Sequence, residues 1–301
     1  MASENTQASA EPPLKQRPVV LLLLDGWGVA PQSEANAFSS AKIPAFLNLS
    51  QEYPVALLNP GNKSLNTRYL ILGAGREFSH ADEVPSLTLS SVLSAASLTQ
   101  IKITETERLA ALTHFFNGHA EYKANGEDWK IVSSAAADKT IKPLLALKRA
   151  VKESLREITA DKTRDFIAIA IPYLDLVAAS GDLETVKKAI ENLDKYLRQI
   201  VSAVLSKNGV LIISAAAGNV EHIHNLSTDL ADTAMTDNPV PLIIVGSEFK
   251  GKTIGLAEPL SGDLSVLAPA GTLADIAPTV LSILGLVKPD EMTGESLLGK
   301  S

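Results

Sequence analysis

An aspartate at the end of an apolar run is the first feature of this sequence that could do chemistry. Residues 19–24 read VVLLLL, and Asp25 and Gly26 follow directly. In an open α/β sheet, sites form at the carboxyl ends of the strands, and a carboxylate there fits a ligand of a hard cation. An aspartate before a glycine is also ordinary turn chemistry. The residues alone leave the metal ligand and the turn aspartate as alternatives.

Two more apolar runs end in segments that could form part of the same edge. Asp175 comes just past residues 166–171 (FIAIAI), and residues 210–213 (VLII) lead into the alanines Ala215–Ala217. Continuous runs of β-branched residues and leucine are typical of parallel strands that are buried on both faces. The strands predicted in this way are 19–24, 166–171, 210–213 and 242–245, with shorter candidates at 55–58 and 101–103.

Helical patterns lie between these strands. Residues 183–205 have apolar side chains at helical spacing, Asp182 can cap the start of this helix, and Asn208–Gly209 can end it. Strands that alternate with helices predict an α/β domain with a mostly parallel central sheet sandwiched between helix layers. We expect one domain over residues 18–298, preceded by a flexible tail at 1–17. The other predicted helices are 35–51, 87–96, 143–157 and 276–284.

Composition narrows the class of protein. Of the 301 residues, 46% are hydrophobic, which excludes a disordered chain. The net charge of −7 argues against nucleic acid as a partner, because phosphate contacts need clustered Lys and Arg, and the absence of cysteine excludes disulfides and thiolate metal sites. The apolar run near the start is far shorter than the roughly 20 residues that cross a bilayer, and residues 1–17 are not typical of a signal peptide. We therefore expect a soluble, cytoplasmic protein with no membrane partner.

Long stretches across residues 17–298 share, in order, the motifs of one family. They are 17–31 (RPVVLLLLDGWGVAP), 35–44 (ANAFSSAKIP), 72–77 (LGAGRE), 88–118, 237–246 (DNPVPLIIVG), 273–286 (LADIAPTVLSILGL) and 289–298 (PDEMTGESLL). In these stretches the chain resembles the phosphatase-like (metalloenzyme) domain of cofactor-independent (2,3-bisphosphoglycerate-independent) phosphoglycerate mutase, in the alkaline phosphatase superfamily. The resemblance implies an alkaline-phosphatase-like fold.

The resemblance also implies a chemistry. Members of the family interconvert 2- and 3-phosphoglycerate through a phosphoserine, and two divalent cations, usually manganese, hold the serine and the phosphate. Such cations lower the pKa of the serine and clamp the attacking and leaving oxygens. Carried over by motif, two metal-binding aspartates are retained as Asp25 and Asp175, and the active-site lysine is replaced by Arg108. The nucleophilic serine falls at Leu65, and a one-residue shift would place it at Ser64.

Most other metal-binding positions of the family have changed. An open site with one carboxylate per cation holds divalent ions weakly. Alanine in place of a ligand relieves like-charge repulsion in an emptied cleft, but Asp25 and Asp175 still need positive partners. We expect Arg108 or Arg68 to form a salt bridge with one of them. The changed positions are Ala179, Ala216, Ala217, Asp232 and Met235 at metal ligands, and Tyr69 and Arg68 at the His and Gly that close the serine motif.

A whole domain of the family is expected to be missing from the interior of this chain. In the mutases a transferase domain lies between the serine motif and the helix that begins TLxxVL. Here residues 77–87 (EFSHADEVPSL) are all that separates Arg76 from Thr88. Because the arginines that bind phosphoglycerate belong to that domain, we expect no phosphoglycerate binding.

These losses together predict a degenerate phosphoglycerate-mutase-like protein. The favoured interpretation is a catalytically inactive pseudoenzyme that acts as a binding or assembly partner of an unidentified protein and needs no cofactor. The alternative is a residual or repurposed metal-dependent phosphohydrolase or phosphomutase with one cation, manganese or another. It would use Asp25, Asp175 and Ser64. Asp232 could add a further ligand. The sequence leaves the question of activity open.

Two further features have a bland interpretation and a functional one. His222 and His224 lie on one side of an extended segment and could form a new metal site with Asp229 or Asp232, although two such histidines are more often surface residues. The predicted helix 143–157 has a basic face that is either solvated or docks an acidic partner. Its basic residues are Lys148, Arg149, Lys152 and Arg156.

Overall fold

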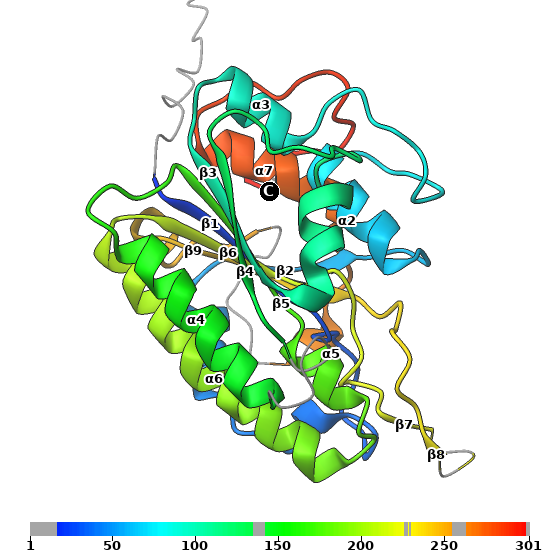
Figure 1. Ribbon diagram of the computed structural model, residues 1–301. Helices are drawn as coiled ribbons and strands as arrows, with labels where there is room; N and C mark the ends of the chain where they lie inside the picture. Colours follow the sequence, from blue (N-terminus) through cyan, green and yellow to red (C-terminus); the bar gives the residue numbers. More distant parts are fainter. Residues whose placement is uncertain (1–16, 135–141, 226–227, 229, 255–262, 299–301) are drawn as a thin grey trace, which may run out of the picture.

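An eight-stranded sheet forms the centre of the part of the chain that the structure describes (Figure 1). The computed structural model describes residues 17–134, 142–225, 228, 230–254 and 263–298. The strands of this sheet are β1 (Val19–Leu24), β2 (Val55–Asn59), β3 (Gln100–Glu105), β4 (Glu127–Val132), β5 (Phe166–Ile171), β6 (Val210–Ser214), β9 (Val240–Val245) and β10 (Gly271–Thr272). Their order is β10-β2-β9-β6-β1-β5-β3-β4, and β9 runs antiparallel to β2 and β6. A separate hairpin pairs β7 (His224–Asn225) with β8 (Leu230–Ala231).

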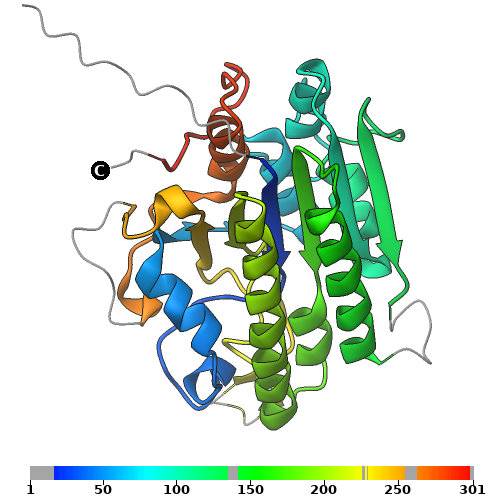
Figure 2. The same cartoon turned by 90° about the vertical axis from the view of Figure 1, so that its left-hand side faces the viewer.

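Helices cover both faces of the sheet. They are α1 (Pro44–Glu52), α2 (Leu65–Ala74), α3 (Leu89–Ala95), α4 (Pro143–Thr159), α5 (Tyr173–Ala178), α6 (Leu183–Ser206) and α7 (Ile276–Ile283). The helices α1, α4 and α6 pack together on one face, whereas α2, α3 and α7 lie on the other (Figure 2). The basic side chains of α4 are exposed: Lys148, Arg149, Lys152 and Arg156.

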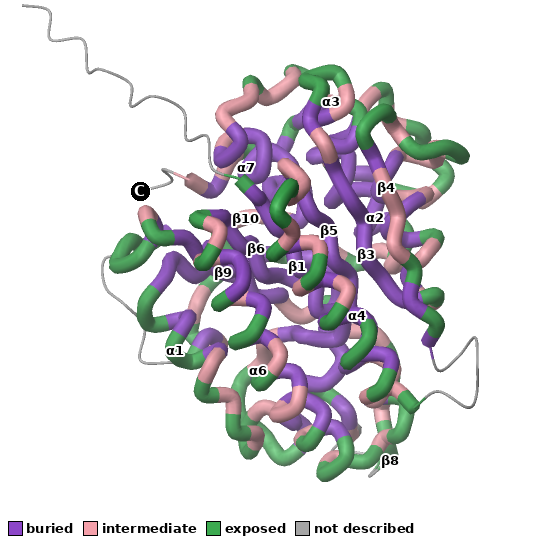
Figure 3. The backbone as a smooth tube through the Cα atoms, turned by 60° about the vertical axis from the view of Figure 1, so that its left-hand side comes forward, coloured by how far each residue is buried: buried purple, intermediate pink, exposed green. Residues whose placement is uncertain are grey.

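The central strand β1 is buried on both faces because it pairs with β5 and β6. Both pairings are parallel, and Leu22 lies opposite Ile169 on one side and Ile213 on the other. Every residue of β1 is at most 1% exposed, and Figure 3 shows these buried strands inside the helix layers. Full burial of a leucine or isoleucine side chain stabilises the fold by about 1.5–3 kcal/mol. The backbone at the end of β1 is therefore held rigidly, and so is the position of the residue that follows it, Asp25.

The structure confirms the α/β class and the mostly parallel sheet. All six predicted strands form, with ends that differ by a few residues at most. The elements that the pattern did not predict include β4 and α2. The strand β4 lies at the edge of the sheet and is partly exposed, so it has no continuous apolar run. The helix α2 is buried along most of its length, so it lacks the polar face by which an amphipathic helix is recognised.

The prediction of one helix over residues 35–51 is wrong. The chain instead forms a short 3₁₀ turn, Ala37–Ser39, which Asn36 caps, and α1 begins at Pro44. Proline fits the first turn of a helix, but its ring disfavours helical backbone at the preceding residue, Ile43. Pro44 therefore marks the start of α1, and the residues between the 3₁₀ turn and Pro44 are not helical.

Residues 1–16 of the predicted tail lie outside the described residues. Arg17, the last residue of that segment, pairs with Asp165 at a distance of 2.6 Å. Within the described ranges, none of the helices is both long enough and apolar enough to span a bilayer.

A buried ion pair joins β3 to β4. The Nζ atom of Lys102 lies 2.7 Å from Oε1 of Glu127, and neither side chain has exposed surface. The ammonium also donates to the side-chain oxygens of Ser90 and Asn117. Burial lowers the pKa of Lys102 to about 8, and the carboxylate of Glu127 opposes that shift. Each charge is therefore kept in the interior by the other.

Replacing Lys102 with methionine should lower the free energy of unfolding by about 3–5 kcal/mol, because Glu127 is left charged and unpaired. Adding Glu127→Gln to Lys102→Met should recover more than half of the loss, since a neutral amide is easier to bury than a carboxylate. Urea unfolding measures both variants. The exposed change Lys152→Met is the control, with an expected effect within about 0.5 kcal/mol. A double variant no more stable than the single one would contradict this account.

Candidate functional site

Three charged residues that the sequence analysis singled out meet at one edge of the sheet. Asp25 follows β1, Asp175 lies in the first turn of α5 after β5, and Arg108 ends a 3₁₀ turn after β3. The strands β1, β5 and β3 are parallel neighbours in that order. Their carboxyl ends therefore open at the same edge, where α/β proteins place their sites.

The guanidinium of Arg108 bridges the two carboxylates. Its Nε atom lies 2.6 Å from Oδ2 of Asp25, and its Nη2 atom lies 2.5 Å from Oδ2 of Asp175. Arg108 and Asp25 are buried, whereas the side chain of Asp175 is 30% exposed. The predicted salt bridge is thus confirmed for Arg108. Arg68 instead pairs with Asp237 at 2.6 Å and donates to backbone carbonyls.

Two neutral donors complete the surroundings of Asp25. The hydroxyl of Tyr69 donates to Oδ2 at 2.8 Å, and the backbone N–H of Ala216 donates to Oδ1 at 3.1 Å. Burial, followed by the charge of Asp25, raises the pKa of Tyr69 well above its usual value, so the phenol remains a donor. Burial lowers the pKa of Arg108, but its anionic neighbours raise that pKa by more. We call Asp25, Tyr69, Arg108 and Asp175 the Arg108 network.

Glycine is required in the turn that follows Asp25. The φ angle of Gly26 is 97°, in the left-handed region, and a Cβ atom there would lie 2.6 Å from the backbone nitrogen of Asp175. That nitrogen donates to the carbonyl of Asp25 at 3.3 Å. The Asp-Gly pair therefore has the turn-forming role that its sequence allowed, and the turn brings the two aspartates together.

Two residues that the sequence analysis did not assign organise the loops around the network. Asn219 donates through Nδ2 to Oδ1 of Asp175 at 2.8 Å. The buried carboxylate of Glu221 accepts from the backbone N–H groups of Gly28, at 3.2 Å, and Asn219, at 2.8 Å, and from two side chains of the segment before β9. One carboxylate thus joins the segments that follow β1 and β6 to the segment that precedes β9. The sequence offered one signal for Glu221, namely an acidic residue that follows soon after the predicted strand 210–213.

Ser64 caps α2 and does not join the Arg108 network. Its hydroxyl accepts from the N–H of Thr67 at 3.2 Å and lies 2.8 Å from Oγ1 of the same residue. Across the described part of the chain, no hydrogen bond links Ser64 to the network. Leu65, the other position considered for the nucleophile, packs against the core. A catalytic role for Ser64 or Arg108 remains a prediction.

The residues at this edge do not fit the cation pair that the family implies. Ala216 and Ala217 are buried and offer only methyl side chains where the resemblance implies an aspartate and a histidine. The positive charge that faces Asp25 and Asp175 is the guanidinium of Arg108, at hydrogen-bonding distance from both. A cation that bridged the Oδ2 atoms of these two carboxylates would have to take the place of that guanidinium.

A metal site elsewhere has no support in the described residues. None of them form a group of three or more His, Asp or Glu side chains that could hold a metal ion. In the alternative considered around His222 and His224, Nε2 of His222 lies 3.8 Å from Oδ2 of Asp232. Asp229, the other acidic residue of that alternative, lies outside the described residues.

Comparison with known sequences identifies the family. The Metalloenzyme superfamily matches residues 17–288, so the chain belongs to that superfamily. The 2,3-bisphosphoglycerate-independent phosphoglycerate mutase of Acetivibrio thermocellus is 39% identical over 214 residues, which are 71% of this chain and 39% of that enzyme. The enzyme of the same name from Desulforudis audaxviator is 37% identical over 212 residues, which are 70% of this chain and 38% of that enzyme. The chain therefore spans about 39% of the length of such relatives.

Solved structures have the same fold. A Leishmania mexicana phosphoglycerate mutase superimposes with a TM-score of 0.72 at 13% identity, covering 94% of this chain and 98% of that one. The alkaline phosphatase from the Antarctic bacterium TAB5 does so with a TM-score of 0.60 at 10% identity, covering 92% and 100%. The chain is an alkaline-phosphatase-like metalloenzyme domain related to 2,3-bisphosphoglycerate-independent phosphoglycerate mutase, as the resemblance implied.

Arg108→Ala should lower the free energy of unfolding by about 3–5 kcal/mol, because Asp25 loses its positive partner while it stays buried. The matched control is Arg156→Ala, which breaks an exposed pair with Glu153 at 3.2 Å and should cost less than about 1 kcal/mol. Urea unfolding at neutral pH compares the two variants. Equal losses would show that the Arg108 bridge is no more important than a surface pair.

A second expectation concerns Glu105, the last residue of β3. Burial, together with the charge of Glu107, raises the pKa of Glu105 from 4.5 to about 8. Between these pH values the folded chain holds a proton that the unfolded chain has released, so stability should fall as the pH rises from 4.5 to 8. Glu105→Gln should remove this slope and therefore stabilise the protein more at pH 8 than at pH 5.

Urea unfolding of the parent and of Glu105→Gln at the two pH values measures this difference. The expected change is up to a few kcal/mol, since each unit of pKa shift corresponds to about 1.4 kcal/mol. Parallel stability profiles for the two proteins would mean that Glu105 is ionised in the fold.

Proposed function

We propose that this chain is a catalytically inactive member of the phosphoglycerate-mutase-like metalloenzymes and acts as a binding or assembly partner of another protein in the cytoplasm. The observation that carries the proposal is the Arg108 bridge between Asp25 and Asp175. A single guanidinium pairs with the two carboxylates that cations would otherwise hold and offsets one of their two negative charges. The scaffold of the site is kept with a positive partner that is not a metal.

The chemistry of a guanidinium supports inactivity. A divalent cation activates a nucleophile and binds phosphoryl oxygens through open coordination positions. Arginine has no such positions, because it interacts through N–H donors and does not act as a Lewis acid. Nε and Nη2 of Arg108 are already directed at Asp25 and Asp175. The hydroxyl of Ser64 is engaged in capping α2, so a nucleophile next to the network is also missing from the proposed arrangement.

The connection between α2 and α3 is consistent with the loss of the substrate-holding domain. Residues 75–88 link the two helices directly and contain neither helix nor strand. We propose that residues 18–298 form one domain and that the transferase insertion of the mutases is absent between 77 and 87. Without that insertion the chain has no counterpart of the surface that binds phosphoglycerate, and protein, rather than nucleic acid or membrane, is the proposed partner.

One observation favours the alternative, a residual metal-dependent phosphohydrolase. The Oδ1 atom of Asn219 is buried and has no hydrogen-bond partner among the described residues, although its Nδ2 atom contacts Asp175. An amide oxygen beside a carboxylate suits a hard cation. With Asp25 and Asp175 it would supply a single site, provided that Arg108 moved away. The inactive form is preferred because it needs no such displacement.

Metal binding and turnover distinguish the two functions. After extensive dialysis, elemental analysis should find no stoichiometric metal, and calorimetric titration with MnCl₂ should show no saturable binding. Hydrolysis of p-nitrophenyl phosphate should not depend on added Mn²⁺. Manganese-dependent hydrolysis that Asp25→Ala abolishes would overturn the proposal.

A gain-of-binding variant serves as the positive control. The triple change Arg108→Lys, Ala216→Asp and Ala217→His restores the family residues and should give measurable Mn²⁺ binding, because it removes the guanidinium and adds two ligands. Arg108→Lys alone should not. If the triple variant folds but binds no better than the parent, Arg108 and the alanines are not what keeps the cations out.

A further inference from the structure

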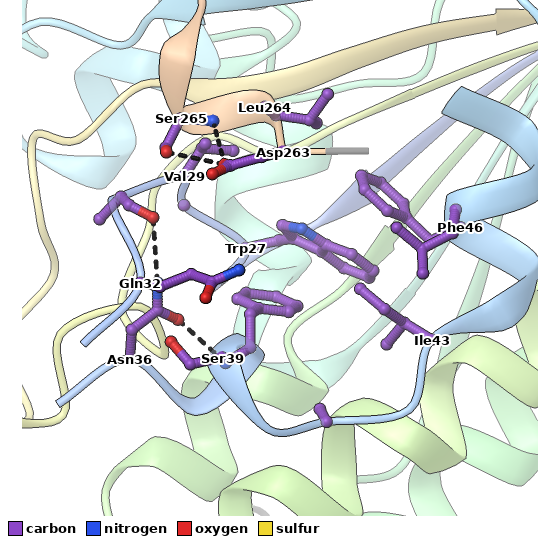
Figure 4. Close-up of a pocket in the computed structure, with 15 residues that line it drawn as sticks. Trp27, Val29, Gln32, Asn36, Ser39, Ile43, Phe46, Asp263, Leu264 and Ser265 are labelled. Carbon is purple, nitrogen blue, oxygen red and sulfur yellow. Dashed lines mark hydrogen bonds between the residues drawn. The ribbon is translucent and has the colours of Figure 1, made fainter. Parts of the chain in front are cut away.

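A mostly apolar pocket lies beside the turn that carries Asp25 (Figure 4). Its volume is about 210 Å³. The indole of Trp27 forms one wall, with its ring centroid 4.8 Å from that of Phe38 and 4.5 Å from that of Phe46. The indole contacts both phenyl rings with its plane tilted by 34° to each, so it is held between two side chains, and Figure 4 shows the Trp27 ring next to Phe46 and Ile43.

The loop that forms another wall is held by Asn36. Its Nδ2 atom donates to the carbonyl oxygens of Ala30, at 3.0 Å, and Pro31, at 3.2 Å. Its Oδ1 atom accepts from the backbone N–H of Phe38 at 2.9 Å. The side-chain amide of Asn36 thus fixes the conformation of this loop. These hydrogen bonds place Phe38 in the pocket wall before any ligand binds. A preformed pocket loses little entropy when it is filled.

The charge at the rim is negative. Of the described residues that line the pocket, Asp263 alone is charged. Its Oδ1 atom accepts from the backbone N–H of Ser265 at 2.9 Å and from the hydroxyl of that residue at 2.7 Å, which orients the carboxylate. In Figure 4 this segment lies across the pocket from Asn36 and Ser39. A ligand therefore meets an apolar aromatic wall at one end and a carboxylate at the other.

From this geometry we propose that the pocket binds a small aromatic ligand that carries an ammonium group. The ring packs against Phe38, which contacts the buried indole of Trp27, and against Ile43, and it displaces water from this apolar surface, which supplies most of the affinity. The ammonium pairs with Asp263 at the rim, which sets the orientation and excludes anions. The inference does not depend on whether the Arg108 network is inactive, because the pocket contains none of its residues.

A series of probes with the same ring tests the ligand class. They are 2-phenylethylamine, 2-phenylethanol and 3-phenylpropionate, which carry a positive, a neutral and a negative group. Trp129→Phe leaves Trp27 as the single tryptophan, so its fluorescence reports on the pocket. The amine should bind about two- to fivefold more tightly than the alcohol, the range of an exposed ion pair. The acid should bind most weakly.

Variants locate the binding. Ala41→Phe fills the pocket and should abolish the fluorescence change with all three probes. Asp263→Asn should remove the preference for the amine and leave the alcohol unaffected, whereas the exposed control Asp290→Asn should leave the preference intact. Circular dichroism verifies that each variant folds. Absence of saturable binding to the parent, unchanged binding to Ala41→Phe, or an unchanged preference in Asp263→Asn would each overturn the proposal.

Discussion

A carboxylate that is removed from water needs a positive partner, and for Asp25 that partner is Arg108. Asp25 follows a strand that is buried on both faces and is itself fully buried, so an uncompensated charge there would cost several kcal/mol. The planar fork of a guanidinium can meet the carboxylate after β1 and the carboxylate in the first turn of α5 at once, which the single point charge of a lysine does less well. The structure around this edge of the sheet depends on that one bridge.

The rest of the edge is held by contacts that need no metal. Gly26 lets β1 turn close to the backbone of Asp175, and Glu221 ties together the loops after β1 and β6 and the segment before β9. Their donors are backbone N–H groups and neutral side chains, and none of these contacts involves the guanidinium of Arg108. A frame of this kind fits the proposed function, in which an arginine takes the place of the cations while the strands keep their arrangement.

Local patterns predicted most of the frame and missed particular parts of it. Continuous apolar runs identified the buried strands, because burial on both faces leaves a signal in consecutive residues. The edge strand β4 has polar residues on its exposed side, and α2 is buried nearly all round, so neither shows the pattern of its class. The loop before Pro44 was misjudged as helix, since apolar spacing was weighed above the constraint that proline places on the preceding residue.

The sequence by itself determined the fold class, the aspartates at two strand ends, and the alanines that stand where the family has metal ligands. It also led to the expectation that Arg108 or Arg68 pairs with one of the aspartates. The tertiary structure alone decided that this arginine is Arg108, with Tyr69 and Asn219 beside it, while Arg68 turns to Asp237. The physical reason is distance along the chain. Local patterns depend on residues that are close in the sequence. Contacts among residues 25, 69, 108, 175 and 219 depend instead on the spatial order of the strands in the sheet, where β5 lies between β1 and β3.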